Sequence, residues 1–207
     1  MTGPSAPGYA ARVLVAFAVL ALADWIAVAR GWRTLEYVAK PGALLALIGW
    51  AATGAPSPWL IAALAFSLAG DVFLMLPTDS FVPGLVAFLV GHLAYIGAFH
   101  APIGSRLPWL MVPLAVSAVV GTRMLRAIPT DGMRALVALY SLAIAAMVAS
   151  ALASGTMAAA AGALLFLLSD TLIGWDRFVR RTAWAPLVII VTYHLGQLGL
   201  TTALRHG

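Results

Sequence analysis

The chain has 207 residues, of which 63% are hydrophobic and only 9% are charged, and its mean hydropathy is +1.00. Charged residues make up about 25% of an ordinary soluble domain, so this composition excludes a water-soluble globule and indicates an integral membrane protein. Cysteine is absent, which excludes disulfides and thiolate metal sites. The net charge of +5 comes from basic residues between apolar segments, a pattern that sets membrane orientation and does not indicate nucleic-acid binding.

Apolar runs of about 20 residues, the length that spans a bilayer core, recur along the chain. They predict an all-α bundle of eight transmembrane helices at 12–29, 34–52, 58–76, 81–99, 107–122, 133–152, 156–175 and 184–204. Turn-forming residues separate the runs, as at 56–58 and 129–132. The runs are continuously apolar, which argues against a membrane β-barrel with its alternating strands. We expect one membrane domain over residues 1–207.

The arginines predict how the bundle is oriented. One set of loops holds eight of them, namely Arg30, Arg33, Arg123, Arg126, Arg134, Arg177, Arg180 and Arg181, and the opposite side holds Arg12, Arg106 and Arg205. Because positively charged loops stay in the cytoplasm, we expect the larger set to be cytoplasmic and both termini to be outside. The expected location is a bacterial plasma membrane.

Ionisable side chains inside membrane spans are costly and usually mark function. The predicted spans contain six of them: Asp24, Lys40, Asp71, His92, Asp170 and His194. At a rise of 1.5 Å per residue, the aspartates and the lysine lie roughly 8–9 Å inside the arginine-rich side, and the histidines lie near the midplane. For the aspartates, a functional role and structural pairing are both open. Lys40 either serves as a compact buried ammonium group or extends its amine to the nearby surface.

Two segments of the sequence show a weak similarity to each other. Segment 66–71 and segment 165–170 each end in an aspartate, and each is followed by a helix that carries one histidine and one tyrosine. A parallel structural repeat explains this pattern, and so does coincidence in a chain rich in alanine and leucine.

Two inward-facing carboxyl groups favour acid–base chemistry, because one can hold a proton while the other stays ionised near Lys40. This suits a hydrolase and equally a proton-coupled carrier, and a non-catalytic lipid-binding protein is a third reading. The polar residues gather near one side, which favours a one-sided lipid site over a path through the membrane. Four more residues are polar enough to line the cavity: Tyr95, Ser169, Tyr193 and Gln197. Nucleotide, zinc-protease and serine-hydrolase motifs are absent, so the sequence predicts neither a cofactor nor a metal.

A set of short motifs occurs in one order along the chain. They are Lys40-Pro41, the segment 67–71, Phe81, Gly84-Leu85, Phe88, Gly91-His92, Tyr95, the segment 162–170, Thr192-Tyr193 and Gln197. In this ordered set the chain resembles the YhhN family of membrane proteins, whose characterised members are lysoplasmalogenases. It departs from the family pattern at His194, where a second tyrosine is expected.

The resemblance implies an eight-helix bundle that hydrolyses the vinyl ether bond of lysoplasmalogen to a fatty aldehyde and a glycerophospho-base. Asp71 and Asp170 match the two motif aspartates, which makes them the implied catalytic pair. One would protonate the β-carbon of the vinyl ether, and the other would activate water and stabilise the cation. The residues expected to bind substrate or support the site are Asp24, Lys40, His92, Tyr95, Ser169, Tyr193 and Gln197. The expected partners are a single-chain ether phospholipid and the bilayer, with no nucleic acid.

Overall fold

A computed structural model describes residues 6–206, and nearly all of this range is helical. The helices are α1 (Ala6–Arg30), α2 (Arg33–Ala52), α3 (Pro58–Met75), α4 (Phe81–Ala98), α5 (Ile103–Arg106), the 3₁₀ turn η1 (Leu107–Leu110), α6 (Met111–Ala127), α7 (Asp131–Ala153), α8 (Met157–Phe178) and α9 (Ala185–Leu204). The described part of the chain contains no strand, so the predicted all-α membrane fold is confirmed.

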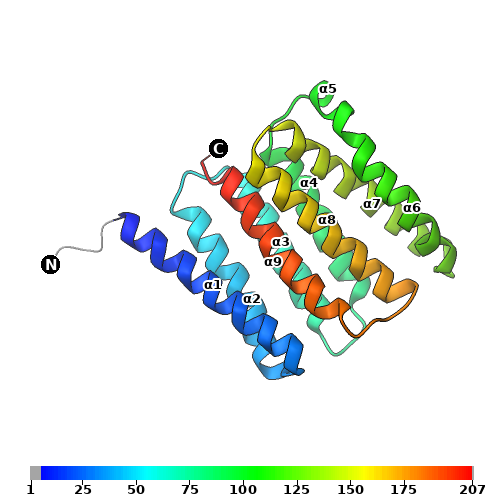
Figure 1. The fold of residues 1–207 in the computed structure, drawn as a ribbon, viewed down its shortest axis with the longest axis horizontal. Coiled ribbons are helices and arrows are strands. Elements are labelled where there is room, and N and C mark those ends of the chain that lie inside the picture. The colour runs from blue at the N-terminus through cyan, green and yellow to red at the C-terminus, as the bar shows by residue number, and fades with distance from the viewer. Residues whose placement is uncertain (1–5, 207) are drawn as a thin grey trace.

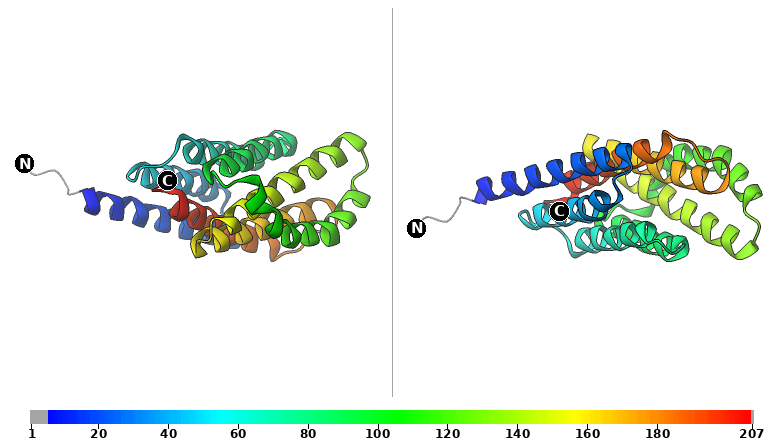
Figure 2. Two further views of the ribbon diagram at one scale, coloured as in Figure 1. Left: turned by 90° about the horizontal axis from the view of Figure 1, so that it is seen from above. Right: turned by 90° about the horizontal axis from the view of Figure 1, so that it is seen from below.

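The long helices run along one common direction (Figures 1 and 2). Figure 1 shows α1 and α2 at one side of the bundle, α6 and α7 at the other, and the pairs α3–α4 and α8–α9 between them. Within each pair the two helices pack closely against each other, and α4 also contacts α7 while α9 contacts α1 and α2. The main core cluster takes buried residues from α1 to α4 and from α7 to α9.

Each predicted span corresponds to a helical segment, with one clear difference. Within residues 6–206, six helices are long and apolar enough to cross a membrane, and the bent segment from α5 to α6 makes a seventh. The segment predicted at 107–122 bends by 46° between Ile103–Leu110 and Pro113–Ala127. Prolines inside this segment explain the break, because a proline removes a helical hydrogen bond and clashes with the preceding turn. Helix α2 has the length of a span, but its charged residues lower its hydropathy.

Local sequence signals fix several helix ends. The hydroxyl of Ser57 accepts a hydrogen bond from the Leu60 amide at the start of α3, and Thr156 caps α8 in the same way through Ala159. Gly31 ends α1 with φ of 68°, a left-handed conformation that glycine adopts without steric cost. These caps explain why the predicted turns fall where they do.

Glycines let α8 and α9 approach closely. A Cβ atom added at Gly162 would lie 2.6 Å from the backbone nitrogen of Leu200, and one at Gly199 would lie 2.7 Å from the Cα of Gly162. Small residues at helix contacts favour such packing in membranes, where there is little hydrophobic drive between helices. The close approach of α8 and α9 therefore depends on these two glycines.

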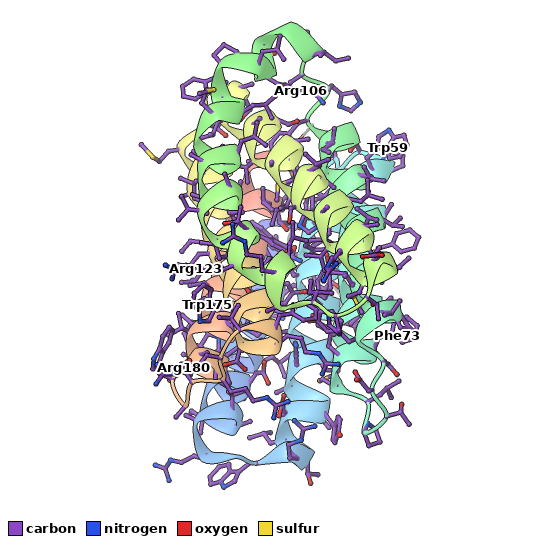
Figure 3. All side chains as sticks on the ribbon, turned by 90° about the vertical axis from the view of Figure 1, so that its right-hand side faces the viewer. Trp59, Phe73, Arg106, Arg123, Trp175 and Arg180 are labelled. Atoms are coloured by element: carbon purple, nitrogen blue, oxygen red, sulfur yellow. The ribbon has the colours of Figure 1, made fainter. Side chains whose placement is uncertain are left out.

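The predicted arginine-rich loops lie at one end of the bundle, which we call the arginine-rich end. Figure 3 shows Arg180 near this end and Arg106 at the opposite end. Several helices are longer than predicted, so Arg126, Arg134 and Arg177 belong to terminal turns of α6, α7 and α8 and not to loops. Their place at this end of the bundle is unchanged.

Candidate active site

Asp71 on α3 is a buried carboxylate with two partners from other helices. Lys40 Nζ lies 3.1 Å from Asp71 Oδ1, and Tyr193 donates its hydroxyl to Asp71 Oδ2 at 2.7 Å. The side chain of Asp71 is 2% exposed and that of Lys40 is 14% exposed. The amine of Lys40 is thus turned inward to the carboxylate, which settles the two readings of this lysine in favour of the buried ammonium group.

Asp170 on α8 has a different set of partners. Tyr140 on α7 donates its hydroxyl to Asp170 Oδ2, and Nε2 of His92 lies 3.6 Å from the same oxygen. The rings of His92 and Tyr140 stand edge to face with centroids 5.1 Å apart. Among the described residues, no lysine or arginine forms an ion pair with Asp170. This carboxyl group therefore has a hydroxyl and an imidazole around it where Asp71 has an ammonium group.

The two sites are built alike from corresponding helices. The first half of the chain supplies a partner from α2, an aspartate from α3 and a third residue from α4, and the second half supplies the same from α7, α8 and α9. Within each half the first two residues contact each other, as Lys40 contacts Asp71 and Tyr140 contacts Asp170. The third residue crosses over: His92 meets the aspartate of the second half and Tyr193 that of the first. This exchange supports a parallel repeat as the reason why segments 66–71 and 165–170 are similar.

A layer of aromatic rings connects the two aspartate sites. The ring of Phe166 stands edge to face against His92 at 5.0 Å and against Tyr193 at 5.4 Å between centroids. Phe88 packs against Tyr193 at 5.9 Å. Packed aromatic rings, and not a water-filled space, thus separate the two aspartate sites.

An apolar pocket opens beside Asp170, between α4, α6, α7 and α8. Its empty volume, which includes the open mouth, is about 720 Å³. Asp170 and Tyr140 lie in its wall, and the rest of the lining consists mainly of Leu74, Phe81, Leu85, Phe88, Val116, Val120, Gly121, Met124, Val137, Ser141, Ile144, Leu167, Thr171, Ile173, Gly174 and Phe178. Asp71 is linked to this pocket through Tyr193, which packs against Phe88 in the wall. We call this space the α6 pocket.

Asp24 and His194 form a third buried cluster, between α1 and α9. Trp25 donates its indole N–H to His194 Nδ1 at 3.0 Å, so Nε2 of His194 carries the proton of the neutral ring. This nitrogen lies 4.0 Å from Asp24 Oδ2. Within the described part of the chain, neither carboxylate oxygen of Asp24 has a hydrogen-bond partner. The cluster lies on the side of the bundle away from the α6 pocket.

The remaining predicted site residues make structural contacts. Tyr95 donates its hydroxyl to Gln197 Oε1 in the core, and Ser169 donates to the backbone carbonyl of Ile189 at 3.1 Å. These contacts tie α4 to α9 and α8 to α9. The residues that line the α6 pocket in the described part of the chain do not include these three.

The loop between α3 and α4 is joined to the end of α8 by an ion pair. Arg177 Nη2 donates to Asp79 Oδ2 at 2.5 Å. This hydrogen bond lowers the pKa of the Asp79 carboxyl. Over residues 6–206, no group of three or more histidines, aspartates and glutamates is arranged to hold a metal ion.

Tyr140 is the residue that sequence reasoning missed. It sits in a long apolar run, where a single tyrosine is read as packing or as an interfacial anchor. The only available signal was its position in the second half, which matches that of Lys40 in the first half. Trp25 and Phe166 were missed for the same reason, because aromatic residues in apolar helices are common.

Comparison with known proteins gives a consistent result. The profile of the YhhN family matches residues 35–204. The human lysoplasmalogenase TMEM86B is 39% identical over 74% of this chain and 66% of its own length. The mouse lysoplasmalogenase TMEM86B is 34% identical over 88% of this chain and 80% of its own length.

A bacterial lysoplasmalogenase is also similar to the chain. The lysoplasmalogenase of Mycobacterium bovis is 32% identical over 72% of this chain and 61% of its own length. The chain thus spans about two thirds or less of the human and mycobacterial relatives. No solved structure matches the chain.

Proposed function

The chain belongs to the YhhN family, and on this premise we propose that it is a membrane ether hydrolase that acts on lysoplasmalogens. The reaction cleaves the vinyl ether bond with one water molecule and yields a fatty aldehyde and glycerophospho-ethanolamine or -choline. The relatives that are lysoplasmalogenases by name support this substrate class. The observation that carries the proposal is a carboxyl group, Asp170, hydrogen-bonded by Tyr140 in the wall of an apolar pocket.

Asp170 is proposed to act as the general acid. A vinyl ether hydrolyses when a proton is added to its β-carbon, which leaves an oxocarbenium ion stabilised by the ether oxygen. A buried carboxyl group without a cationic partner costs less when it is protonated, because burying an unpaired charge is expensive. Asp170 has this environment and faces the space in which the alkenyl group would lie. The proton therefore passes from Asp170 to the β-carbon.

The same carboxylate then completes the reaction. Having lost its proton, Asp170 accepts one from the attacking water, whose oxygen bonds to the carbon of the oxocarbenium ion. The resulting hemiacetal collapses when a proton is returned to the glycerol oxygen and the hemiacetal hydroxyl loses its own. Tyr140 donates to Asp170 Oδ2 and thereby fixes which carboxyl oxygen points into the pocket. His92 lies against the same oxygen and limits its rotation.

Asp71 is proposed as the second carboxylate of the pair, with an indirect part in the chemistry. It stays ionised in its pair with Lys40 and holds Tyr193 by a hydrogen bond. Tyr193 supports Phe88, which forms the pocket wall. Asp71 thus acts through the position of Tyr193 and Phe88, because its ion pair with Lys40 has no net charge to offer the cationic intermediate.

The lipid is proposed to enter from the bilayer beside α6. This helix forms one side of the α6 pocket with small or flexible residues, including Val120, Gly121 and Met124. A single-chain lipid presents one alkenyl tail and so requires only one apolar channel. The expected partners are thus this lipid and the surrounding membrane.

We propose that the arginine-rich end faces the cytoplasm of a bacterial cell and that both termini lie outside. The charge difference between the two ends supports this orientation, since the positive-inside rule counts lysine and arginine near the ends of spans. Figure 3 labels Arg180 near the arginine-rich end and Arg106 at the opposite end.

Aldehyde release from purified protein tests the proposed function. The protein in detergent is incubated with lysoplasmenyl-ethanolamine and with its saturated 1-O-alkyl analogue. We expect aldehyde and glycerophosphoethanolamine in equal amounts from the first lipid and no product from the second, because an alkyl ether has no double bond to protonate. Equal consumption of both lipids, or of neither, would contradict the proposed reaction.

A further inference from the structure

The α6 pocket extends to the arginine-rich end of the bundle. Phe81 is the first residue of α4 and Phe178 is the last of α8, and both line the pocket. Their rings stand edge to face with centroids 5.5 Å apart. The pocket thus begins at the level where two helices end and the loops start, which is where a bilayer meets water.

A charged group stands at this mouth. The guanidinium carbon of Arg177 lies 4.9 Å from the centroid of the Phe81 ring, a cation–π contact with a residue of the pocket wall. The same guanidinium donates to Asp79, whose side chain is 66% exposed. Ion pairs this exposed contribute little net stability, so another anion can replace the Asp79 carboxylate at small cost.

Arg177 and Asp170 are in register on one helix. They are seven residues apart on α8, which places them on the same face about 10 Å apart along the axis. In a lysoplasmalogen the phosphate and the vinyl ether are held apart by the glycerol carbons. Arg177 near the mouth and Asp170 two helical turns deeper are therefore spaced to contact the phosphate and the vinyl ether of one lipid molecule.

We propose that Arg177 binds the phosphate of the lipid headgroup at the mouth of the α6 pocket, in place of Asp79. This inference rests on the proposed function and adds the headgroup site to it. A guanidinium group binds phosphate through paired, charge-assisted hydrogen bonds, a geometry that a surface lysine does not provide. With the phosphate held there, the glycerol reaches inward along α8 and the alkenyl chain continues toward the apolar wall around Val116.

The test uses two variants that break the same ion pair. Arg177→Gln removes the phosphate ligand, and Asp79→Asn removes the group that competes for it. We expect Arg177→Gln to raise KM for lysoplasmenyl-ethanolamine by about tenfold, the usual scale for a lost charged hydrogen bond. Asp79→Asn is expected to lower KM for this lipid. Arg180→Gln is the matched control for loss of a positive charge in the same region, and its KM is expected to stay unchanged.

A substrate without phosphate separates binding from structure. For 1-alkenylglycerol, which carries the same ether and no phosphate, both variants are expected to have the wild-type KM. If Arg177→Gln and Asp79→Asn change KM in the same direction, or affect both substrates equally, the ion pair only holds the loop and the headgroup site is wrong. An unchanged KM in Arg177→Gln also overturns it.

Binding of the saturated 1-O-alkyl analogue keeps this test independent of turnover. Its Kd is measured in detergent for the wild type and the two variants, with the same opposite shifts expected. If the wild type releases no aldehyde but Arg177→Gln still weakens this binding tenfold, the proposed hydrolysis fails and the headgroup site stands. If aldehyde is released and the Kd does not change, the reverse holds.

Discussion

Tyr140 donates its hydroxyl to the carboxyl group of Asp170 at the wall of the α6 pocket, and its ring stands edge to face against His92. This contact is the counterpart of the ion pair between Lys40 and Asp71 in the first half of the chain. One half thus has a charged pair and the other a neutral donor at the corresponding place. Of the two aspartates, Asp170 with its neutral donor is the one that lies in the wall of the α6 pocket.

Replacing Tyr140 by phenylalanine tests the hydroxyl alone, because the ring and its contact with His92 remain. We expect kcat for lysoplasmenyl-ethanolamine to fall by about 10–100-fold, since a misplaced acid loses most of its catalytic advantage. KM is expected to change little. The measurement is steady-state aldehyde release by the purified variant.

Ser150→Ala is the control for Tyr140→Phe. Ser150 lies on the same helix, is buried and donates only to the Ala146 carbonyl, so its loss also removes one buried hydroxyl. It should leave kcat unchanged. If both variants lower kcat to the same extent, Tyr140 has no special part in the reaction.

Lys40→Met tests the charged pair in the first half. It leaves the buried Asp71 carboxylate with Tyr193 as its partner, and removal of one member of a buried pair costs about 3–5 kcal/mol. We expect a marked drop in the midpoint of thermal unfolding in detergent. In the double variant Lys40→Met/Asp71→Asn the charge is gone as well, so most of the lost stability should return. Equal midpoints for the single and double variants would show that the pair does not hold the bundle together.

Gly162→Ala tests the close packing of α8 on α9. The added Cβ would lie 2.6 Å from a backbone nitrogen, so the helices must move apart, at a cost of about 1–3 kcal/mol. Gly132→Ala, at the start of α7, is the control because a Cβ there meets no atom within 4 Å. We expect the unfolding midpoint to fall for Gly162→Ala only. A midpoint at the wild-type value in Gly162→Ala is the opposing result.

The orientation is tested with reporters fused after Gly207. An alkaline phosphatase fusion, which is active only outside the cytoplasm, is expected to be active because both termini are proposed to lie outside. A green fluorescent protein fusion at the same point is expected to stay dark. Fluorescence with an inactive phosphatase would reverse the proposed topology.

The sequence predicted the helical segments well because membrane spans are set by hydropathy and length. It missed the bend between α5 and α6, since a segment with Pro108 and Pro113 is apolar enough to be read as one straight helix. The ionisable residues in the spans were also visible, because each is an exception in an apolar run.

The pairing of these residues was not visible in the sequence. Hydropathy gives the depth of a residue but not the rotation of its helix, and rotation decides which side chains meet. The histidines were expected deeper than the aspartates, yet His92 reaches Asp170 and His194 approaches Asp24, because side chains extend along the helix axis. Tyr140 shows the same limit, since only the structure shows what its hydroxyl contacts.

The central claim is that Asp170 supplies the proton that breaks the vinyl ether. The most direct test is aldehyde release by Asp170→Asn, which keeps the size of the side chain and removes the proton, with Asp71→Asn measured beside it. Both variants are first shown to keep the helical content of the wild type. We expect Asp170→Asn to lose about 10²–10⁴-fold in kcat, the usual contribution of a general acid, and Asp71→Asn to lose less. A folded Asp170→Asn protein that releases aldehyde at the wild-type rate would contradict the account.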